Sequence, residues 1–219
     1  MKRIGIIGAG RFGLSLAESL ANAGQEVVLV DRNRPAMQSA SEFATAMQGD
    51  ATQPHVLEEA GFGECDLAVV AIGSNIEASM MATANCKELG IPNVVSKASS
   101  ELHGKILRRI GADNVIYPDR DSANRLARAI ANHNVIDFLE VSDGYSIAEI
   151  SVPSSAVGKS LAESSFRSTV GLSVLCVRRS DPDDPAKPRK VLIPQAQDVL
   201  TPGDRLIVFG ETSKLDALS

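Results

Sequence analysis

Residues 3–33, "RIGIIGAGRFGLSLAESLANAGQEVVLVDRN", constrain the fold more than any other stretch of the chain. Isoleucines at positions 4, 6 and 7 predict a short buried strand that ends at Gly8. Apolar residues then recur at helical spacing as far as Gly24, and the wholly apolar residues 27–30 predict a second strand. A strand, a glycine turn, a helix and a second strand form one unit of a parallel α/β sheet.

The same alternation continues to residue 116. We expect strands at residues 44–48, 67–72, 94–95 and 115–116, and helices from residue 34, at 54–59, 76–89 and 102–110. This order predicts a Rossmann-like, doubly wound parallel sheet.

After residue 134 the pattern changes. Strands are expected at 145–152, 173–178, 190–193 and 205–209, with short helical stretches near Leu161 and Leu215. We therefore expect a nucleotide-binding domain over residues 1–135 and a smaller α+β domain over residues 136–219. A helix near residues 122–132 is expected to bridge them.

Gly8, Gly10 and Gly13 have the spacing of a dinucleotide-binding turn. The first glycine permits a tight turn, the second lets phosphate approach the backbone, and the third lets helix and strand pack closely. The turn follows a strand and opens a helix, whose N-terminus attracts pyrophosphate. Asp31 then ends the second strand, eighteen residues after Gly13, where an acid binds the ribose hydroxyls.

Three polar residues around this turn each have two interpretations. Asp31 is a ribose ligand or the N-cap of the next helix. As a ribose ligand it favours a free 2′-hydroxyl, although the neighbouring Arg32 could accommodate a 2′-phosphate. Arg11 reaches the phosphates or faces solvent on the first helical turn. Asp50 accepts from the adenine amine or serves only its own turn.

Composition and charge exclude several classes of function. The net charge of −5 argues against nucleic-acid binding. The chain has neither an apolar run of bilayer length nor a signal-peptide core at its start, and its three cysteines are expected to be buried, reduced thiols of a cytoplasmic protein.

The histidines are isolated, and motifs for a serine nucleophile or a Walker lysine are missing from the sequence. We therefore expect a binding protein rather than an enzyme. The alternatives are a small NAD(P)-dependent oxidoreductase and a nucleotide-binding interaction module without a transport partner.

The segments "GAGRFG", "LVDRN", "GDAT", "AVVAIGSNIEAS" and "YPDRD" follow one another in the order and spacing of the RCK (KTN) proteins. The whole chain resembles this KtrA/TrkA family of cytosolic gating subunits of bacterial potassium uptake systems. The resemblance implies homodimers that assemble into an octameric ring beneath a membrane channel subunit of the KtrB or TrkH type. It also implies that ATP and ADP, or secondarily NAD(H), bind the Rossmann cleft and bias the ring shape and the pore. The chain would then be peripheral on the inner face of the membrane.

The resemblance also implies which residues act. The expected nucleotide ligands are Gly8, Gly10, Arg11, Phe12, Gly13, Asp31, Arg32, Asp50, Ala51, Ile72, Gly73, Ser74, Asn75 and Lys97. Asp119 lies where the family carries a glutamate that holds a divalent cation, and a turn aspartate is the alternative. Some family members bind cyclic di-AMP in the C-terminal lobe. Pro194 fits that pattern, whereas Leu161 and Ala162 replace the branched apolar pair expected there.

Overall fold

The computed structural model describes residues 1–131, 135–181, 187 and 189–217. Their backbone divides into two compact units, Met1–Pro118 and Asp119–Ser219. Helix α6 (Pro118–Ala131) therefore groups with the C-terminal unit, although the sequence placed the domain boundary after residue 135. That functional boundary stays a prediction.

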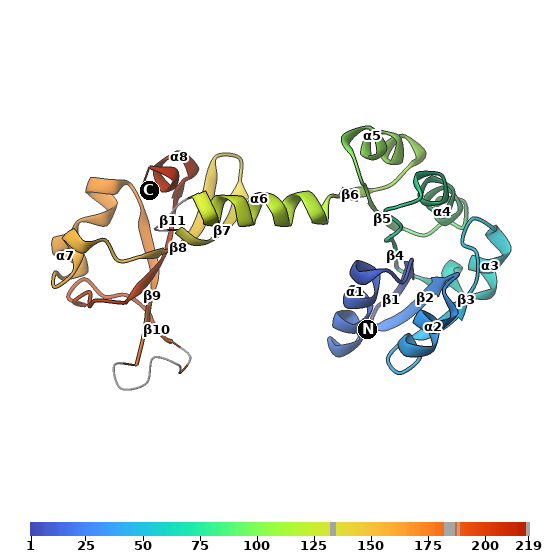
Figure 1. The fold of residues 1–219 in the computed structure, drawn as a ribbon, viewed down its shortest axis with the longest axis horizontal. Helices are drawn as coiled ribbons and strands as arrows, with labels where there is room; N and C mark the ends of the chain where they lie inside the picture. The colour runs from blue at the N-terminus through green and yellow to red at the C-terminus, as the bar shows by residue number, and fades with distance from the viewer. Residues whose placement is uncertain (132–134, 182–186, 188, 218–219) are drawn as a thin grey trace. The chain divides into compact units, whose positions relative to one another are not determined.

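The N-terminal unit is a six-stranded, all-parallel sheet in the order β3-β2-β1-β4-β5-β6, with helices between successive strands (Figure 1). This confirms the predicted doubly wound α/β fold. Its elements are β1 (Arg3–Ile7), α1 (Arg11–Asn22), β2 (Glu26–Asp31), α2 (Arg34–Ala40), β3 (Thr45–Gln48), α3 (Pro54–Glu59), the turn η1 (Phe62–Glu64), β4 (Leu67–Val70), α4 (Ile76–Glu88), β5 (Asn93–Lys97), α5 (Glu101–Ile110) and β6 (Asn114–Ile116).

Strand β2 shows why this sheet needs apolar residues at successive positions. Val28 and Val30 pack into one core with residues of α3 and α4. Val27 and Leu29 pack into a second core with residues of α1 and α2. Successive side chains of a strand point to opposite faces, so a strand covered on both faces reads as a continuous apolar run.

The C-terminal unit is a five-stranded antiparallel sheet in the order β10-β9-β11-β8-β7 (Figure 1). Its further elements are β7 (Val135–Ser142), β8 (Tyr145–Ser151), η2 (Ser154–Ala156), α7 (Leu161–Ser164), η3 (Phe166–Val170), β9 (Ser173–Arg179), β10 (Lys190–Leu192), β11 (Arg205–Glu211) and α8 (Thr212–Asp216). Ile150, Leu206 and Val208 are buried on the face that packs against the rest of this unit. The small α+β domain expected after residue 135 is therefore present.

Two elements of this unit differ from the sequence prediction. Strand β7 is not predicted by the sequence, because the apolar positions of "VIDFLEV" recur at helical rather than alternating spacing. Helix α6 begins at Pro118, four residues earlier than expected, with proline at a position that needs no backbone donor. Residue 132, where that helix was expected to end, lies outside the described residues.

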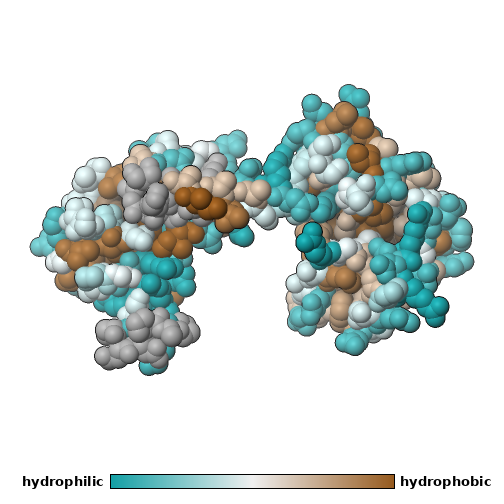
Figure 2. Space-filling view, viewed as in Figure 1, coloured by the Kyte–Doolittle hydropathy of each residue, from teal (hydrophilic) through white to brown (hydrophobic). Residues whose placement is uncertain are grey.

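Helix α6 leaves apolar side chains in solvent. Leu126 and Ile130, one helical turn apart, are 61% and 71% exposed, and Figure 2 shows apolar surface on the C-terminal unit. Among the described residues, none of the helices combines the length and the apolar character that a bilayer span requires.

A buried ion pair joins β9 to the start of β11. The Asp204 side chain is 1% exposed, and Arg179 donates to both of its carboxylate oxygens at 2.7–3.2 Å. Burial alone raises the pKa of Asp204, but hydrogen bonds from Arg179 and Thr201 outweigh it and hold that pKa below its usual value of 3.8.

Asp204→Asn should therefore lower the free energy of unfolding at pH 7 by about 2 kcal/mol, the usual worth of a hydrogen bond to a charged group. The carboxylate of a group with a depressed pKa stabilises the fold above pH 4 and loses this effect as the pH falls through the folded-state pKa. The difference between wild type and variant in urea unfolding should thus narrow on acidification below pH 4. Asp143→Asn, on the exposed β7–β8 turn, is the control, and an equal loss there would contradict the assignment.

Candidate nucleotide-binding site

A cleft of about 160 Å³ lies within the N-terminal unit, at the carboxyl ends of β1, β2, β3 and β4. β1 pairs with β2 on one side and with β4 on the other, so the chain reverses the direction of sheet growth here. Open α/β sheets bind their ligands at such a switch point. The lining residues are Ile7, Gly8, Val30, Asp31, Arg32, Gly49, Asp50, Ala51, Thr52, Ile72, Asn75 and Ala78.

Glycine is needed at each of the three positions of the turn for a different structural reason. Gly8 has a φ of +105°, a conformation that strains any other residue. A Cβ on Gly13 would lie 1.9 Å from the Gly8 carbonyl oxygen, so only glycine lets α1 approach the turn this closely. A Cβ on Gly10 would meet nothing within 4 Å. Gly10 therefore borders open space, as the glycine facing a phosphate should.

The N-terminus of α1 is free to bind an anion. Gly10 is its N-cap and supplies no side-chain acceptor to the first N–H groups. Arg11 follows as the first helical residue; it is exposed and makes neither a hydrogen bond nor an ion pair with the described residues. The helix dipole, the open N–H groups and this guanidinium all favour negative charge.

The carboxylate of Asp31 ties the end of β2 to the glycine turn. It accepts hydrogen bonds from the Ala9 N–H at 2.6 Å and from the Asn33 N–H at 2.7 Å. The side chain of Asn33, not that of Asp31, caps α2 by accepting from the Ala36 N–H. The N-cap interpretation of Asp31 is therefore wrong. An ionised carboxylate has about four acceptor sites, so two remain for ribose hydroxyls.

Asp50 is held on both oxygens at the end of β3. Oδ1 accepts from the N–H and the hydroxyl of Thr52 at 3.0 and 2.8 Å, and Oδ2 pairs with Arg32. Burial raises the pKa of Asp50, but the hydrogen bonds from Arg32 and Thr52 lower it below the usual range. Asp50 therefore serves its own turn as an anion, and its contact with adenine stays a prediction.

The β4–α4 turn and the start of α4 form another wall of the cleft, and the end of β5 lies next to that turn. Asn75 caps α4 by accepting from the Ala78 N–H at 3.0 Å. The Lys97 ammonium lies 5.6 Å from the centre of the Phe12 ring, and its Cε would be 3.5 Å from a Cβ on Gly73. Lys97 therefore crosses Gly73 toward the first turn of α1.

The structure brings together seven of the residues predicted to bind nucleotide along the cleft, namely Gly8, Asp31, Arg32, Asp50, Ala51, Ile72 and Asn75. Gly10, Arg11, Phe12 and Gly13 open the adjacent helix, Gly73 and Ser74 lie in the turn before α4, and Lys97 ends β5. Sequence reasoning missed Thr52, although its position two residues after Asp50 is typical of an aspartate turn.

Asp119 lies in the first turn of α6 and belongs to the C-terminal unit. Within the described ranges, three or more His, Cys, Asp or Glu side chains nowhere gather as a metal site. The cation role of Asp119 stays a prediction.

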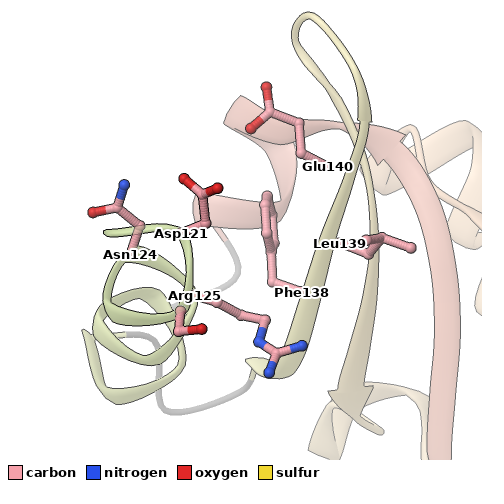
Figure 3. A pocket seen from close by; sticks show the side chains of 7 residues that line it. Asp121, Asn124, Arg125, Phe138, Leu139 and Glu140 are labelled. Carbon is pink, nitrogen blue, oxygen red and sulfur yellow. The ribbon is translucent and has the colours of Figure 1, made fainter. Parts of the chain in front are cut away.

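Two larger cavities lie in the C-terminal unit. One, of about 560 Å³, lies between α6 and β7; Figure 3 shows Asp121, Asn124 and Arg125 extending from the helix and Phe138, Leu139 and Glu140 from the strand. The carboxylates of Asp121 and Glu140 in its lining disfavour the binding of a phosphate group. The other, of about 550 Å³, is lined by Leu161, Ala162, Arg167 and Pro194, among others.

Comparison with known proteins decides the family. The TrkA-N domain family matches residues 4–118, and the TrkA-C domain family matches residues 147–219. The chain is 35% identical over 216 residues to the Ktr system potassium uptake protein C of Bacillus subtilis (strain 168), across 98% of this chain and 94% of that protein. This chain belongs to the Ktr/TrkA family.

Solved structures share the Ktr/TrkA fold. The GsuK channel is similar over 99% of this chain with a TM-score of 0.66 and 23% identity, and this chain spans 38% of that channel's length. A crystal structure of GsuK bound to ADP is 27% identical over 59% of this chain and 34% of its own, with a TM-score of 0.52.

The glycine geometry predicts two different outcomes for alanine. Gly13→Ala should lower the free energy of unfolding by about 3 kcal/mol, because its Cβ overlaps the Gly8 oxygen. Gly10→Ala should lower it by less than about 1 kcal/mol, the scale of an N-cap change, yet weaken nucleotide binding by occupying the space of a phosphate. Urea unfolding and calorimetry measure the two effects. A Gly10→Ala variant that binds nucleotide normally would contradict the phosphate assignment.

Proposed function

We propose that this chain is a nucleotide-binding regulatory subunit of a potassium uptake system and that it switches a membrane channel subunit. The open N-terminus of α1, built from Gly10 and Arg11 beside the anchored Asp31, carries the proposal. Membership of the Ktr/TrkA family, whose relatives are named potassium uptake proteins, supplies the transport context.

In this cleft each part of an adenine nucleotide meets a suitable group. The pyrophosphate lies at the N-terminus of α1, where the N-cap Gly10 offers the first N–H groups no side-chain acceptor. The ribose hydroxyls donate to the remaining lone pairs of Asp31. Adenine lies against Ala51 and Ile72, near Asp50. The likeness to GsuK bound to ADP supports an adenine nucleotide over other anions.

The switch requires that two nucleotides favour different states. A ligand shifts an equilibrium only by the difference between its affinities for the two states. ATP and ADP differ by one phosphate. Arg11, which makes neither a hydrogen bond nor an ion pair within the described residues, is a cation beside the phosphate site that can respond to this difference. We therefore assign ATP and ADP as the primary ligands and NAD(H) as the secondary one.

The partners follow from the same proposal. The chain forms homodimers that assemble into an octameric ring, and the ring binds a KtrB- or TrkH-like channel subunit at the cytoplasmic face of the membrane. The exposed Leu126 and Ile130 of α6 support self-association, because soluble helices rarely leave such pairs in water. Light scattering of the purified chain measures the assembly.

Two further ligands belong to this proposal. The cavity lined by Leu161, Ala162, Arg167 and Pro194 takes cyclic di-AMP, with the guanidinium facing its phosphates. Asp119 helps to hold a divalent cation.

Titration of the purified protein with ADP, ATP and NADH tests the proposal. ADP should bind, and Asp31→Asn should weaken ADP and ATP equally, by about 1–3 kcal/mol, because a charge-assisted bond to the ribose is lost. Glu42→Gln, an exposed acid outside the cleft, is the control. Turnover of NADH with carbonyl substrates, together with poor binding of ADP, would favour an oxidoreductase instead.

Arg11→Ala tests whether the nucleotide acts as a regulatory signal or as a cofactor. This variant should weaken the binding of ATP by about 1–2 kcal/mol more than the binding of ADP, the worth of one charged hydrogen bond to phosphate. It should also abolish the ATP-dependent change in small-angle scattering. Arg34→Ala removes an equal charge from the same position of α2 and should leave the ATP-to-ADP ratio unchanged. Equal losses for both nucleotides in Arg11→Ala would show that Arg11 is an ordinary diphosphate contact.

A further inference from the structure

Arg32 follows directly after the ribose-binding acid of the proposed site. A cation at this point of a Rossmann fold accommodates a 2′-phosphate, whereas the acid before it favours a free 2′-hydroxyl. The sequence therefore contains both signals, Asp31 for a free ribose and Arg32 for a phosphorylated one. The geometry around Arg32 decides between them.

The guanidinium of Arg32 is held by a carboxylate that cannot easily move. Its Nη2 donates to Oδ2 of Asp50, and the other oxygen of Asp50 is fixed by the N–H and the hydroxyl of Thr52. The backbone carbonyl of Arg32 also accepts from the Gln48 side chain at 3.2 Å. Arg32 is thus bound at both its backbone and its tip to the end of β3.

The local charge also opposes a second phosphate. Asp31 is kept in the cleft by the N–H groups of Ala9 and Asn33. Asp31, Arg32 and Asp50 therefore place two negative charges and one positive charge along the same rim. A dianionic 2′-phosphate arriving there would face net repulsion from the two carboxylates.

The Arg32–Asp50 pair adds little to stability. The side chains are 63% and 33% exposed, and ion pairs in such surroundings contribute only about 0–1 kcal/mol because water screens them. Its main effect is positional, since it fixes where one guanidinium lies.

We propose that Asp50 determines nucleotide specificity by holding Arg32 away from the ribose, so that the cleft accepts adenine nucleotides with a free 2′-hydroxyl and rejects 2′-phosphorylated ones. The inference rests on the proposed function, because it assumes that the ribose lies at Asp31. It assigns Asp50 a role distinct from the predicted contact with adenine.

The experiment compares AMP with adenosine 2′,5′-bisphosphate, which differ only in the 2′-phosphate. Asp50→Asn keeps an oxygen for Thr52 but removes the charge that holds Arg32. In wild type the bisphosphate should bind at least about tenfold more weakly than AMP, and Asp50→Asn should reduce that ratio by about tenfold, the worth of one charged hydrogen bond. The ratio within each variant cancels any general loss of affinity.

The double variant Asp50→Asn/Arg32→Gln identifies the cause. The improved binding of the bisphosphate relative to AMP should vanish in this double variant, because the freed guanidinium is absent. If the improvement persists, Asp50 acts only through long-range charge and does not act by holding Arg32. Arg32→Gln alone should not bring the affinity for the bisphosphate closer to that for AMP, because it removes the cation and leaves both carboxylates in place. Glu58→Gln, on the exposed face of α3 outside the cleft lining, should leave the wild-type ratio of affinities unchanged. Thermal melts establish that each variant is folded.

ADP serves as the reference ligand for the proposed function. If wild type fails to bind ADP, the proposed function fails and the inference falls with it. If ADP binds but the bisphosphate and AMP have nearly equal dissociation constants in wild type, only the inference is overturned. The same holds if the ratio of these dissociation constants is equal in wild type and Asp50→Asn.

Discussion

The close approach of Gly13 to the Gly8 carbonyl is the constraint on which the site depends. It sets α1 directly against the turn that leaves β1, which leaves the N-terminus of the helix pointing at the cleft without a side chain in between. The hydrogen bond from the Ala9 N–H to Asp31 then fixes the same turn to the end of β2. The proposed phosphate and ribose sites are thus held in one arrangement before any ligand arrives, which lowers the entropic cost of binding.

This arrangement has two consequences for function. The groups proposed to bind the common part of an adenine nucleotide are anchored: Asp31 by two N–H groups and Asp50 by Thr52. Arg11, beside the phosphate site, makes neither a hydrogen bond nor an ion pair with the described residues. A regulatory site needs both properties, because rigid groups give affinity to every nucleotide while a movable one can distinguish a diphosphate from a triphosphate.

The sequence predicts the elements of this site better than its contacts. Strong local signals, such as the glycine spacing and the continuous apolar run of β2, specify the Rossmann fold and the place of Asp31. The Arg32–Asp50 pair joins residues eighteen positions apart, and only the parallel pairing of β2 with β3 brings them together. The sequence offered Asp31 as a possible cap of α2, but the backbone turns so that Asn33 caps this helix instead. Strand β7 escaped prediction because Phe138 is buried while Leu139 and Val141 are exposed, so apolar residues lie on both of its faces and the apolar pattern lacks the period of a strand.

Amide hydrogen exchange with and without ADP tests the central claim, that the switch point between β1 and β4 is the nucleotide site. Bound ADP should slow exchange at the first N–H groups of α1, residues 10–13, and in the turns at residues 31–33 and 72–75, because these backbone groups contact the ligand or lose access to water. Exchange in β8, β9 and β11 of the C-terminal unit should change far less. Protection confined to the C-terminal unit, or an unchanged exchange rate at residues 10–13 with ADP bound, would contradict this account.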